Sequence, residues 1–265
     1  ASNTGVGRNA LRANTTASNN TAVGRDCLVA NTTGQRNTAV GSLSSQDITT
    51  GDDNVAMGYL SLGSTTTGIE NVAIGVEALQ ANTTGGSNTA VGMRALEANT
   101  TAGNNTAVGV FAMGVNTTGQ FNVAVGGNAL DANTTGDSNV AIGRLSLSAN
   151  TTASHNTAVG YTALLATTTG SFNTSLGSSN LLANTTGAEN IAIGVNALDV
   201  NTTGGLNTAI GNLSLHANTT ASNNTAVGYA SLAATTTGFD NVGLGNNTLK
   251  TNTTGDKNTA VGKNA

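Results

Sequence analysis

The sequence contains no proline, no tryptophan and one cysteine, and it has few aromatic or charged residues. Aromatic residues make up 3% and charged residues 8% of the 265 residues, which excludes an aromatic-rich core and a conventional charged surface. The single Cys27 excludes an internal disulfide framework and a multi-thiolate metal site within one chain. Nine Lys and Arg residues, spread over the whole length, cannot form the basic stripe that binds phosphates, so we expect no nucleic-acid partner.

Long apolar runs are also lacking. None approaches the roughly 20 residues that cross a bilayer, so we expect no membrane insertion. Disorder is disfavoured as well, because 37% of the residues are apolar and the formal net charge is only −4.

What the sequence does contain is a repeat of 17 residues without one insertion. Counting the Asn that recurs from Asn3 to Asn258 as position 0, fifteen complete units read N-T-A-V-G-x-x-A-L-x-A-N-T-T-G-x-x. Position 4 is Gly at every occurrence, position 3 is always apolar, positions 12 and 13 are always Thr-Thr, and position 8 is Leu except at Ser45 and Met113. We treat residues 1–265 as a single repeat domain.

The period predicts the architecture. A unit of 17 residues is too short for the helix pairs of helical solenoids, and Gly and β-branched residues are common in it. The repeat therefore predicts an all-β fold, a parallel β-solenoid (β-roll) of about fifteen coils, with the same positions stacked about 4.8 Å apart. Every invariant residue then forms a ladder along the solenoid.

The variable positions indicate which parts of a coil face outward. Of the 22 charged residues, 21 fall at positions 5, 6, 9, 15 and 16. The aromatic residues fall at the same positions, and we interpret them as outward contacts for a receptor or a neighbouring fibre: Tyr59, Phe111, Phe121, Tyr161, Phe172, Tyr229 and Phe239.

Alternation within the strand segment adds a prediction about assembly. Positions 1 and 3 share one face, which we place in the interior with the Leu of position 8. The other face, positions 2 and 4, holds only small residues, which indicates that another backbone approaches it closely. We therefore predict lateral assembly, favouring a homotrimer, through a small face that includes Ala22, Gly24, Ala39, Gly41, Ala124, Gly126, Ala158 and Gly160.

Two motifs resemble a known group. The segments 37–41 (N-T-A-V-G) and 190–194 (N-I-A-I-G) are similar to coils in the head domains of trimeric autotransporter adhesins, which form left-handed parallel β-rolls. The string at 88–102 is similar to repeats in the shafts of phage tail fibres and other bacterial surface fibres. This resemblance implies an extracellular location, on a cell surface or in a virion fibre, and assembly into fibres.

The residues that could catalyse a reaction or bind a metal do not form a recognisable motif. His155 and His216 occupy different repeat positions, Cys27 replaces a small residue at position 7, and the acids are scattered, so we expect no catalytic residue, cofactor or metal. The Asn-Thr-Thr triplets match the glycosylation pattern, but stacked amides that bond to one another explain them better.

The sequence therefore predicts a non-enzymatic structural shaft or adhesin of an extracellular fibre, with itself as the main partner and a cell-surface or glycan receptor as a second. The alternatives are an ice-binding protein, suggested by the threonine pairs, and a phage tail-fibre shaft that binds a receptor. Because neither end of the sequence departs from the repeat, we expect a segment of a longer repeat protein or a subunit that stacks end to end.

Overall fold

The computed structural model describes residues 2–265, and every regular element in that range is a β-strand. The chain forms two compact units, Ala1–Thr135 and Gly136–Ala265. Unit 1 holds β1 (Thr4–Val6), β2 (Thr21–Val23), β3 (Thr38–Val40), β4 (Val55–Met57), β5 (Val72–Ile74), β6 (Thr89–Val91), β7 (Thr106–Val108) and β8 (Val123–Val125). Unit 2 holds β9 (Val140–Ile142), β10 (Thr157–Val159), β11 (Thr174–Leu176), β12 (Ile191–Ile193), β13 (Thr208–Ile210), β14 (Thr225–Val227), β15 (Val242–Leu244) and β16 (Thr259–Val261).

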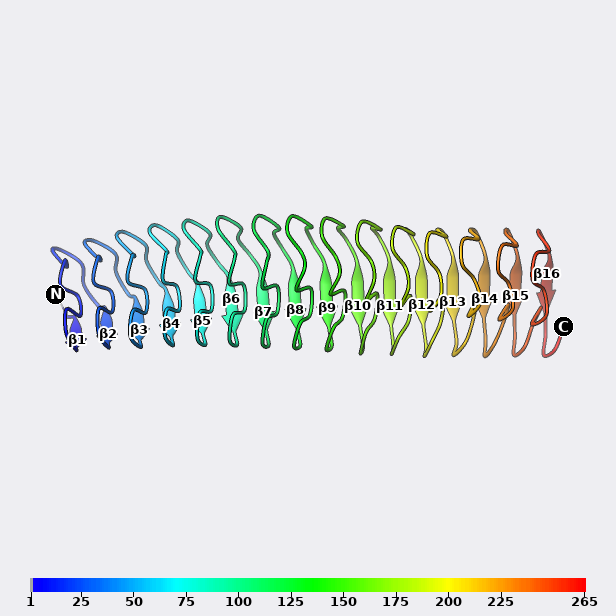
Figure 1. Ribbon diagram of the computed structural model, residues 1–265, viewed down its shortest axis with the longest axis horizontal. Coiled ribbons are helices and arrows are strands. Elements are labelled where there is room, and N and C mark those ends of the chain that lie inside the picture. The colour runs from blue at the N-terminus through cyan, green and yellow to red at the C-terminus, as the bar shows by residue number, and fades with distance from the viewer. Residues whose placement is uncertain (1) are drawn as a thin grey trace. The chain divides into compact units, whose positions relative to one another are not determined.

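Each strand covers positions 1 to 3 of the repeat and pairs in parallel with the same positions of the next coil in its unit. Thr89, for example, aligns with Thr106, and the Thr89 backbone N–H donates to the Asn105 carbonyl oxygen at 2.8 Å. Figure 1 shows this side-by-side order of successive strands within each unit. The predicted parallel β-solenoid with one 17-residue coil per repeat is confirmed.

The glycine at position 4 is required by the close stacking of coils. Gly92 has φ +137°, and a Cβ atom added there would lie 2.5 Å from the Gly109 carbonyl oxygen of the next coil. A side chain would therefore meet backbone as well as strain in φ. The close backbone approach that the sequence indicated is real, but the approaching backbone is the next coil of the same chain.

The interior of each coil is narrow and half polar. Leucine at position 8 is fully buried along most of the solenoid, as at Leu96, and it packs below the strand beside the small residue of position 7. Asparagines are also buried, at most 1% exposed, from Asn20 to Asn241 at position 0 and from Asn31 to Asn218 at position 11. The Asn88 side-chain amide donates to Asn71 Oδ1 at 3.1 Å and to the Ala102 carbonyl at 2.9 Å, and its own Oδ1 accepts the Asn105 backbone N–H at 3.1 Å.

Position 11 forms a second ladder of the same kind. The Asn99 amide donates to Asn82 Oδ1 and to the Ala102 carbonyl, both at 3.0 Å. The acceptor pattern for glycosylation is thus buried in most coils, and its asparagines bond along the stack as the sequence predicted. Ile48 interrupts this ladder, and Asn31 Oδ1 in the preceding coil lacks a hydrogen-bond partner.

The direction of the strand faces is opposite to the prediction. From β2 to β14 the alanines of position 2 are 0% exposed, whereas the residues of position 3 are half-buried or exposed. The cause is the thinness of the coil: a Cβ atom at Gly5 would lie only 3.7 Å from Leu11 Cδ1 across the interior. Position 2 is therefore small because it faces the leucine of position 8. Of the residues predicted to form a lateral interface, Ala22, Ala39, Ala124 and Ala158 lie inside the coil, and Gly24, Gly41, Gly126 and Gly160 are half-buried at the position where coils stack. Lateral assembly itself stays a prediction.

Candidate functional site

The outward face of the sheet is the most regular surface of each unit. Its side chains come from positions 1 and 3: Thr, Val or Ile at position 1 and Val, Ile, Leu or Met at position 3. Neither position holds a charged residue in any strand. Exposed members include Met57 (47%) in unit 1 and Leu176 (48%) in unit 2. The face therefore combines an apolar file at position 3 with a file at position 1 that is Thr in ten of the sixteen strands. Because it carries no charge and exposes several large apolar side chains, this sheet face is the main candidate for an interaction site.

The strand geometry explains why these side chains form two straight files. Alternate residues of a strand point to opposite sides, so Thr89 and Val91 point out while Ala90 points in. Parallel in-register pairing then repeats the same two side chains at the same height in each coil, about 4.8 Å apart.

Two edges with different charges border this face. Positions 15 and 16 lead into the strand and position 5 follows the glycine that ends it. Every charge at position 5 is positive, and these residues are exposed: Arg8, Arg25, Arg144 and Lys263. Positions 15 and 16 carry mainly acids, with two bases among them: Asp52, Asp53, Glu70, Asp137, Glu189, Asp240 and Asp256, with Arg36 and Lys257. Each unit thus has a basic edge and an acidic edge on opposite sides of its sheet face.

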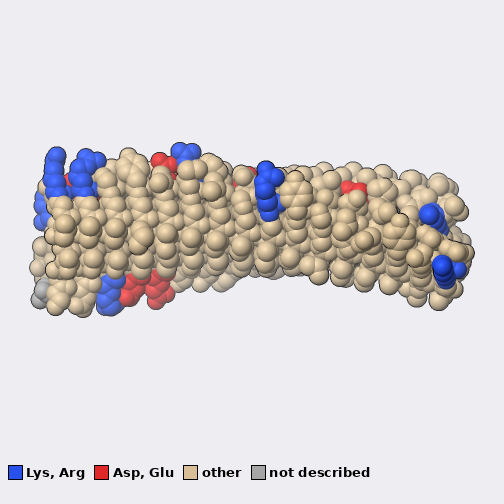
Figure 2. Space-filling model, turned by 90° about the horizontal axis from the view of Figure 1, so that it is seen from below, with Lys and Arg blue, Asp and Glu red and all other residues tan. Residues whose placement is uncertain are grey.

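The acidic edge of unit 1 contains an ion-pair cluster. Arg36 Nη2 lies 2.7 Å from Asp53 Oδ2, and the same nitrogen lies 3.3 Å from Asp52 Oδ2. The hydrogen bonds from Arg36 lower the pKa of the Asp53 carboxyl. Elsewhere Arg94 Nε lies 2.6 Å from Glu77 Oε2, and Arg25 Nη1 lies 3.6 Å from Asp26 Oδ2. Most of the surface in the view of Figure 2 is uncharged.

The predicted outward aromatic residues lie on the turns. Six are exposed by 42 to 59%: Tyr59, Phe121, Tyr161, Phe172, Tyr229 and Phe239. Phe111 is half-buried, and the Arg94 guanidinium carbon lies 5.7 Å from its ring centroid. Phe172 stacks on His155 of the preceding coil, with 4.9 Å between ring centroids. The rings therefore come from several coils and from different sides of the strand, and the structure does not bring them together into one patch.

The titratable residues outside these edges are engaged locally. His216 Nδ1 lies 2.6 Å from Asp199 Oδ1 in the preceding coil. Cys27 is fully buried, its thiol donates to the Ala39 carbonyl at 3.1 Å, and burial raises its pKa to about 11. Such a thiol carries almost no thiolate at neutral pH, and the thiolate is the nucleophile. Across residues 2–265 no group of three or more His, Cys, Asp or Glu residues could hold a metal ion.

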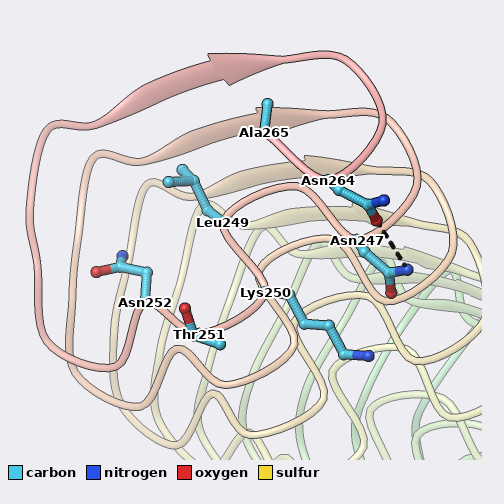
Figure 3. A pocket seen from close by; sticks show the side chains of 7 residues that line it. All are labelled: Asn247, Leu249, Lys250, Thr251, Asn252, Asn264 and Ala265. Atoms are coloured by element: carbon cyan, nitrogen blue, oxygen red, sulfur yellow. Dashed lines mark hydrogen bonds between the residues drawn. The ribbon is translucent and has the colours of Figure 1, made fainter.

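The hollows on the described surface include one pocket in each unit. A pocket of about 570 Å³ lies at the last coil of unit 2, where Leu249 points into the space that the coil encloses (Figure 3). Its only ionisable side chain is Lys250, and the Asn247 amide donates to Asn264 Oδ1 at 3.3 Å. A smaller pocket of about 170 Å³ in unit 1 is lined by Glu97, Phe111, Gly114, Val115, Asn128 and Asp131. Burial raises the pKa of Asp131, which accepts a hydrogen bond from Asn128 Nδ2 at 3.2 Å, and Arg94 Nε lies 3.8 Å from Glu97 Oε2.

Sequence reasoning missed the outward sheet face because it placed positions 1 and 3 in the interior. The sequence shows that these positions lack charge, but positions without charge are also typical of a buried core. The positive charges at position 5 and the acids at positions 15 and 16 flank the strand, and this pattern could have indicated that the strand face between them is exposed.

Comparison with known proteins adds no family: no protein-family model matches the chain, and no curated protein is similar to it. Within residues 2–265, no helix has the length and hydropathy that a membrane span needs. The class that the fold defines is a β-solenoid repeat protein, and the resemblance to adhesin heads and fibre shafts is supported only as far as this architecture.

Proposed function

We propose that the chain is a non-enzymatic structural module of an extracellular fibre, a shaft that spaces or presents other parts of a longer assembly. The observation that carries this proposal is the ladder system inside the coils. In one coil after another, Asn, Thr and backbone groups bond to the same groups of the next coil, as in Asn88 to Asn71 and Thr83 Oγ1 to the Thr100 carbonyl at 3.0 Å. Such a repeat extends by adding coils and needs no separate core for each.

The variable turns support a presenting role. They carry nearly all charges and aromatic rings, while the interior and the sheet face keep one pattern. Substitution on the turns therefore changes the surface chemistry without changing the coil. A receptor on a cell surface, or a glycan, would meet these turns first, and exposed rings such as Phe121 and Tyr161 are the side chains that such a ligand would contact.

Electron microscopy of the purified chain tests the shaft role. We expect thin, straight particles whose length grows in proportion when further 17-residue units are added by cloning. A matched control adds the same number of residues as a Gly-Ser linker, which should not lengthen the ordered particle. Compact particles whose dimensions do not follow the number of units would contradict a shaft.

Ice binding is a second candidate because the solenoid presents threonines in files. Position 1 is Thr in ten of the sixteen strands and points outward, and position 13 is an exposed Thr in every complete unit, as at Thr84. A flat, charge-free array of hydroxyl and methyl groups at about 4.8 Å spacing is suited to ordering water. Thermal hysteresis of the purified chain, compared with a Thr89→Lys/Thr106→Lys variant, measures this activity directly. No hysteresis at millimolar concentration excludes it.

A further inference from the structure

We propose that the outward sheet face is the interface with a second copy of this chain, and that the two copies run in the same direction. This inference rests on the proposed shaft function and identifies its partner. It replaces the small-face interface, whose alanines lie inside the coil.

The first argument is the chemistry of the face. Positions 1 and 3 are free of charge in all strands, and side chains such as Met57, Ile74, Leu176 and Ile210 are each exposed by more than a third. In unit 1 the exposed face widens to position 5, where Val76, Met93 and Val110 are exposed by 43 to 46%. A surface of this composition is covered most completely by another flat β-sheet, because two such sheets pack about 10 Å apart with interdigitated side chains.

The second argument is area. A face about 10 Å wide with a coil every 4.8 Å offers about 390 Å² over the eight coils of one unit, and about twice that over both units. A stable specific interface buries about 800 Å² per partner. Each unit offers about half of this area by itself. Because the two units belong to one chain, binding through the face of one unit raises the effective concentration for binding through the face of the other.

The third argument is charge, and it sets the direction. When two copies pack face to face with their axes parallel, a two-fold axis along the solenoid places the basic edge of one copy over the acidic edge of the other. Arg144, which follows β9, then lies at the same coil height as the partner's Asp137, which precedes β9. Antiparallel packing would instead place basic edge over basic edge and acidic over acidic, and like charges in apposition cost binding energy. Within each unit the two edges have opposite net charge: position 5 carries two bases, whereas positions 15 and 16 carry three acids and Arg36 in unit 1, and four acids and Lys257 in unit 2.

A two-fold pair also uses the face more fully than a three-fold arrangement. Two flat faces cover each other over their whole width, whereas three faces around one axis meet mainly along their edges. Two-fold pairing is also the commonest symmetry of protein assemblies.

Light scattering coupled to size-exclusion chromatography measures the mass. We expect twice the monomer mass of 25.9 kDa for the unmodified chain. The Ile74→Lys/Val91→Lys variant, which places two charges on the sheet face, should elute as a monomer with an unchanged circular dichroism spectrum. The matched control Thr67→Lys/Thr84→Lys adds the same charges at exposed position 13 of neighbouring coils and should stay dimeric.

Cross-linking measures the direction. In a parallel pair, a cysteine introduced by Thr38→Cys on β3 lies near its own copy, and a short bismaleimide able to bridge the roughly 10 Å between packed sheets should join the two chains. The unmodified chain, whose Cys27 is buried, should not be joined. Joining at Thr38→Cys supports the parallel pair, and failure of a dimeric Thr38→Cys variant to react overturns it.

The other possible results also test the proposed interface. A monomer up to millimolar concentration, a trimer, or a dimer that survives Ile74→Lys/Val91→Lys would each overturn the interface. A monomer with thermal hysteresis would assign the sheet face to ice instead. None of these results removes the shaft function, which depends on whether particle length follows the number of repeat units.

Discussion

Each strand has one inner side chain, at position 2, and two outer side chains, at positions 1 and 3, and different forces limit the two sides. On the inner side, Ala90 is fully buried in an interior too narrow for a larger residue. On the outer side, Val91 is half-buried and its neighbours in the file vary among Val, Ile, Leu and Met. Sterics thus fix the inner side, while only the exclusion of charge marks the outer side. In the strands of a thin solenoid, small residues therefore indicate the interior face, and larger apolar residues indicate the outer face.

The largest expected effect comes from the stacking of coils, which both sides of the strand need. Gly92→Ala should lower the free energy of unfolding by about 3 kcal/mol or more, because the new Cβ meets the Gly109 carbonyl and the backbone is held at a strained φ. Gly127→Ala is the control, since the nearest atom to its added Cβ is 4.0 Å away. Urea unfolding followed by circular dichroism measures both. Equal midpoints for the two variants would contradict the role of position 4.

The contrast between the two sides can be tested on one strand. Ala90→Leu forces a large side chain against the leucine layer and should cost about 1 to 3 kcal/mol of stability. Val91→Leu, one residue away on the outer side, should change stability by less than about 0.5 kcal/mol. Urea midpoints again provide the measurement. A larger loss for Val91→Leu than for Ala90→Leu would restore the opposite assignment of the faces.

The polar half of the interior gives the next effect. Asn99→Ala removes the partner of the Asn82 side-chain oxygen, the Ala102 carbonyl and the Asn116 amide, and should cost about 2 kcal/mol because these buried groups are left unpaired. Asn99→Thr should cost less, since Thr65 fills the same position and accepts the Asn82 amide at 3.3 Å. A lower thermal unfolding midpoint for Asn99→Thr than for Asn99→Ala would show that hydrogen bonding does not stabilise the ladder at position 11.

The sequence predicted the coil, its period and the buried Asn ladders, because each of these follows from residue identity repeated at fixed spacing. It did not predict which way the strand faces. A strand of three residues separates two faces but does not say which is inside, and small residues at position 2 fit a close external backbone as well as a thin interior. The turns decide. Leu96 adopts φ +52°, in the left-handed region that leucine seldom enters, and no residue pattern signalled that this bend would bring it beneath the strand.

Smaller effects are expected from the turns, where charges meet water. The Arg36 hydrogen bonds lower the pKa of Asp53 in the folded chain, so this pair contributes stability above the unfolded pKa of Asp and loses it as pH falls through the lowered folded pKa. Because both side chains are exposed, we expect only a slight fall in the unfolding midpoint for Arg36→Ala at pH 7, and a weaker dependence of the midpoint on pH between about 2 and 4. Thermal scans at low and high salt should show that the difference shrinks with salt. A difference that persists at 1 M salt would contradict a surface pair.

Asp131 should show the opposite slope, and the comparison of the two acids isolates burial from pairing. Burial raises the pKa of Asp131, so between the unfolded and the folded pKa the folded state binds more protons than the unfolded state, and stability falls as pH rises through that window. At pH 7 the buried carboxylate is therefore a small liability, and Asp131→Asn should raise the unfolding midpoint slightly. Near pH 3 both forms are neutral and the variant should match the parent chain. Asp240→Asn, at an exposed acid of unit 2, is the control and should leave the midpoint almost unchanged at pH 7. If Asp131→Asn lowers the midpoint at pH 7, the hydrogen bond that Asn128 Nδ2 donates to Asp131 Oδ2 at 3.2 Å outweighs the cost of burial, and the raised pKa is wrong.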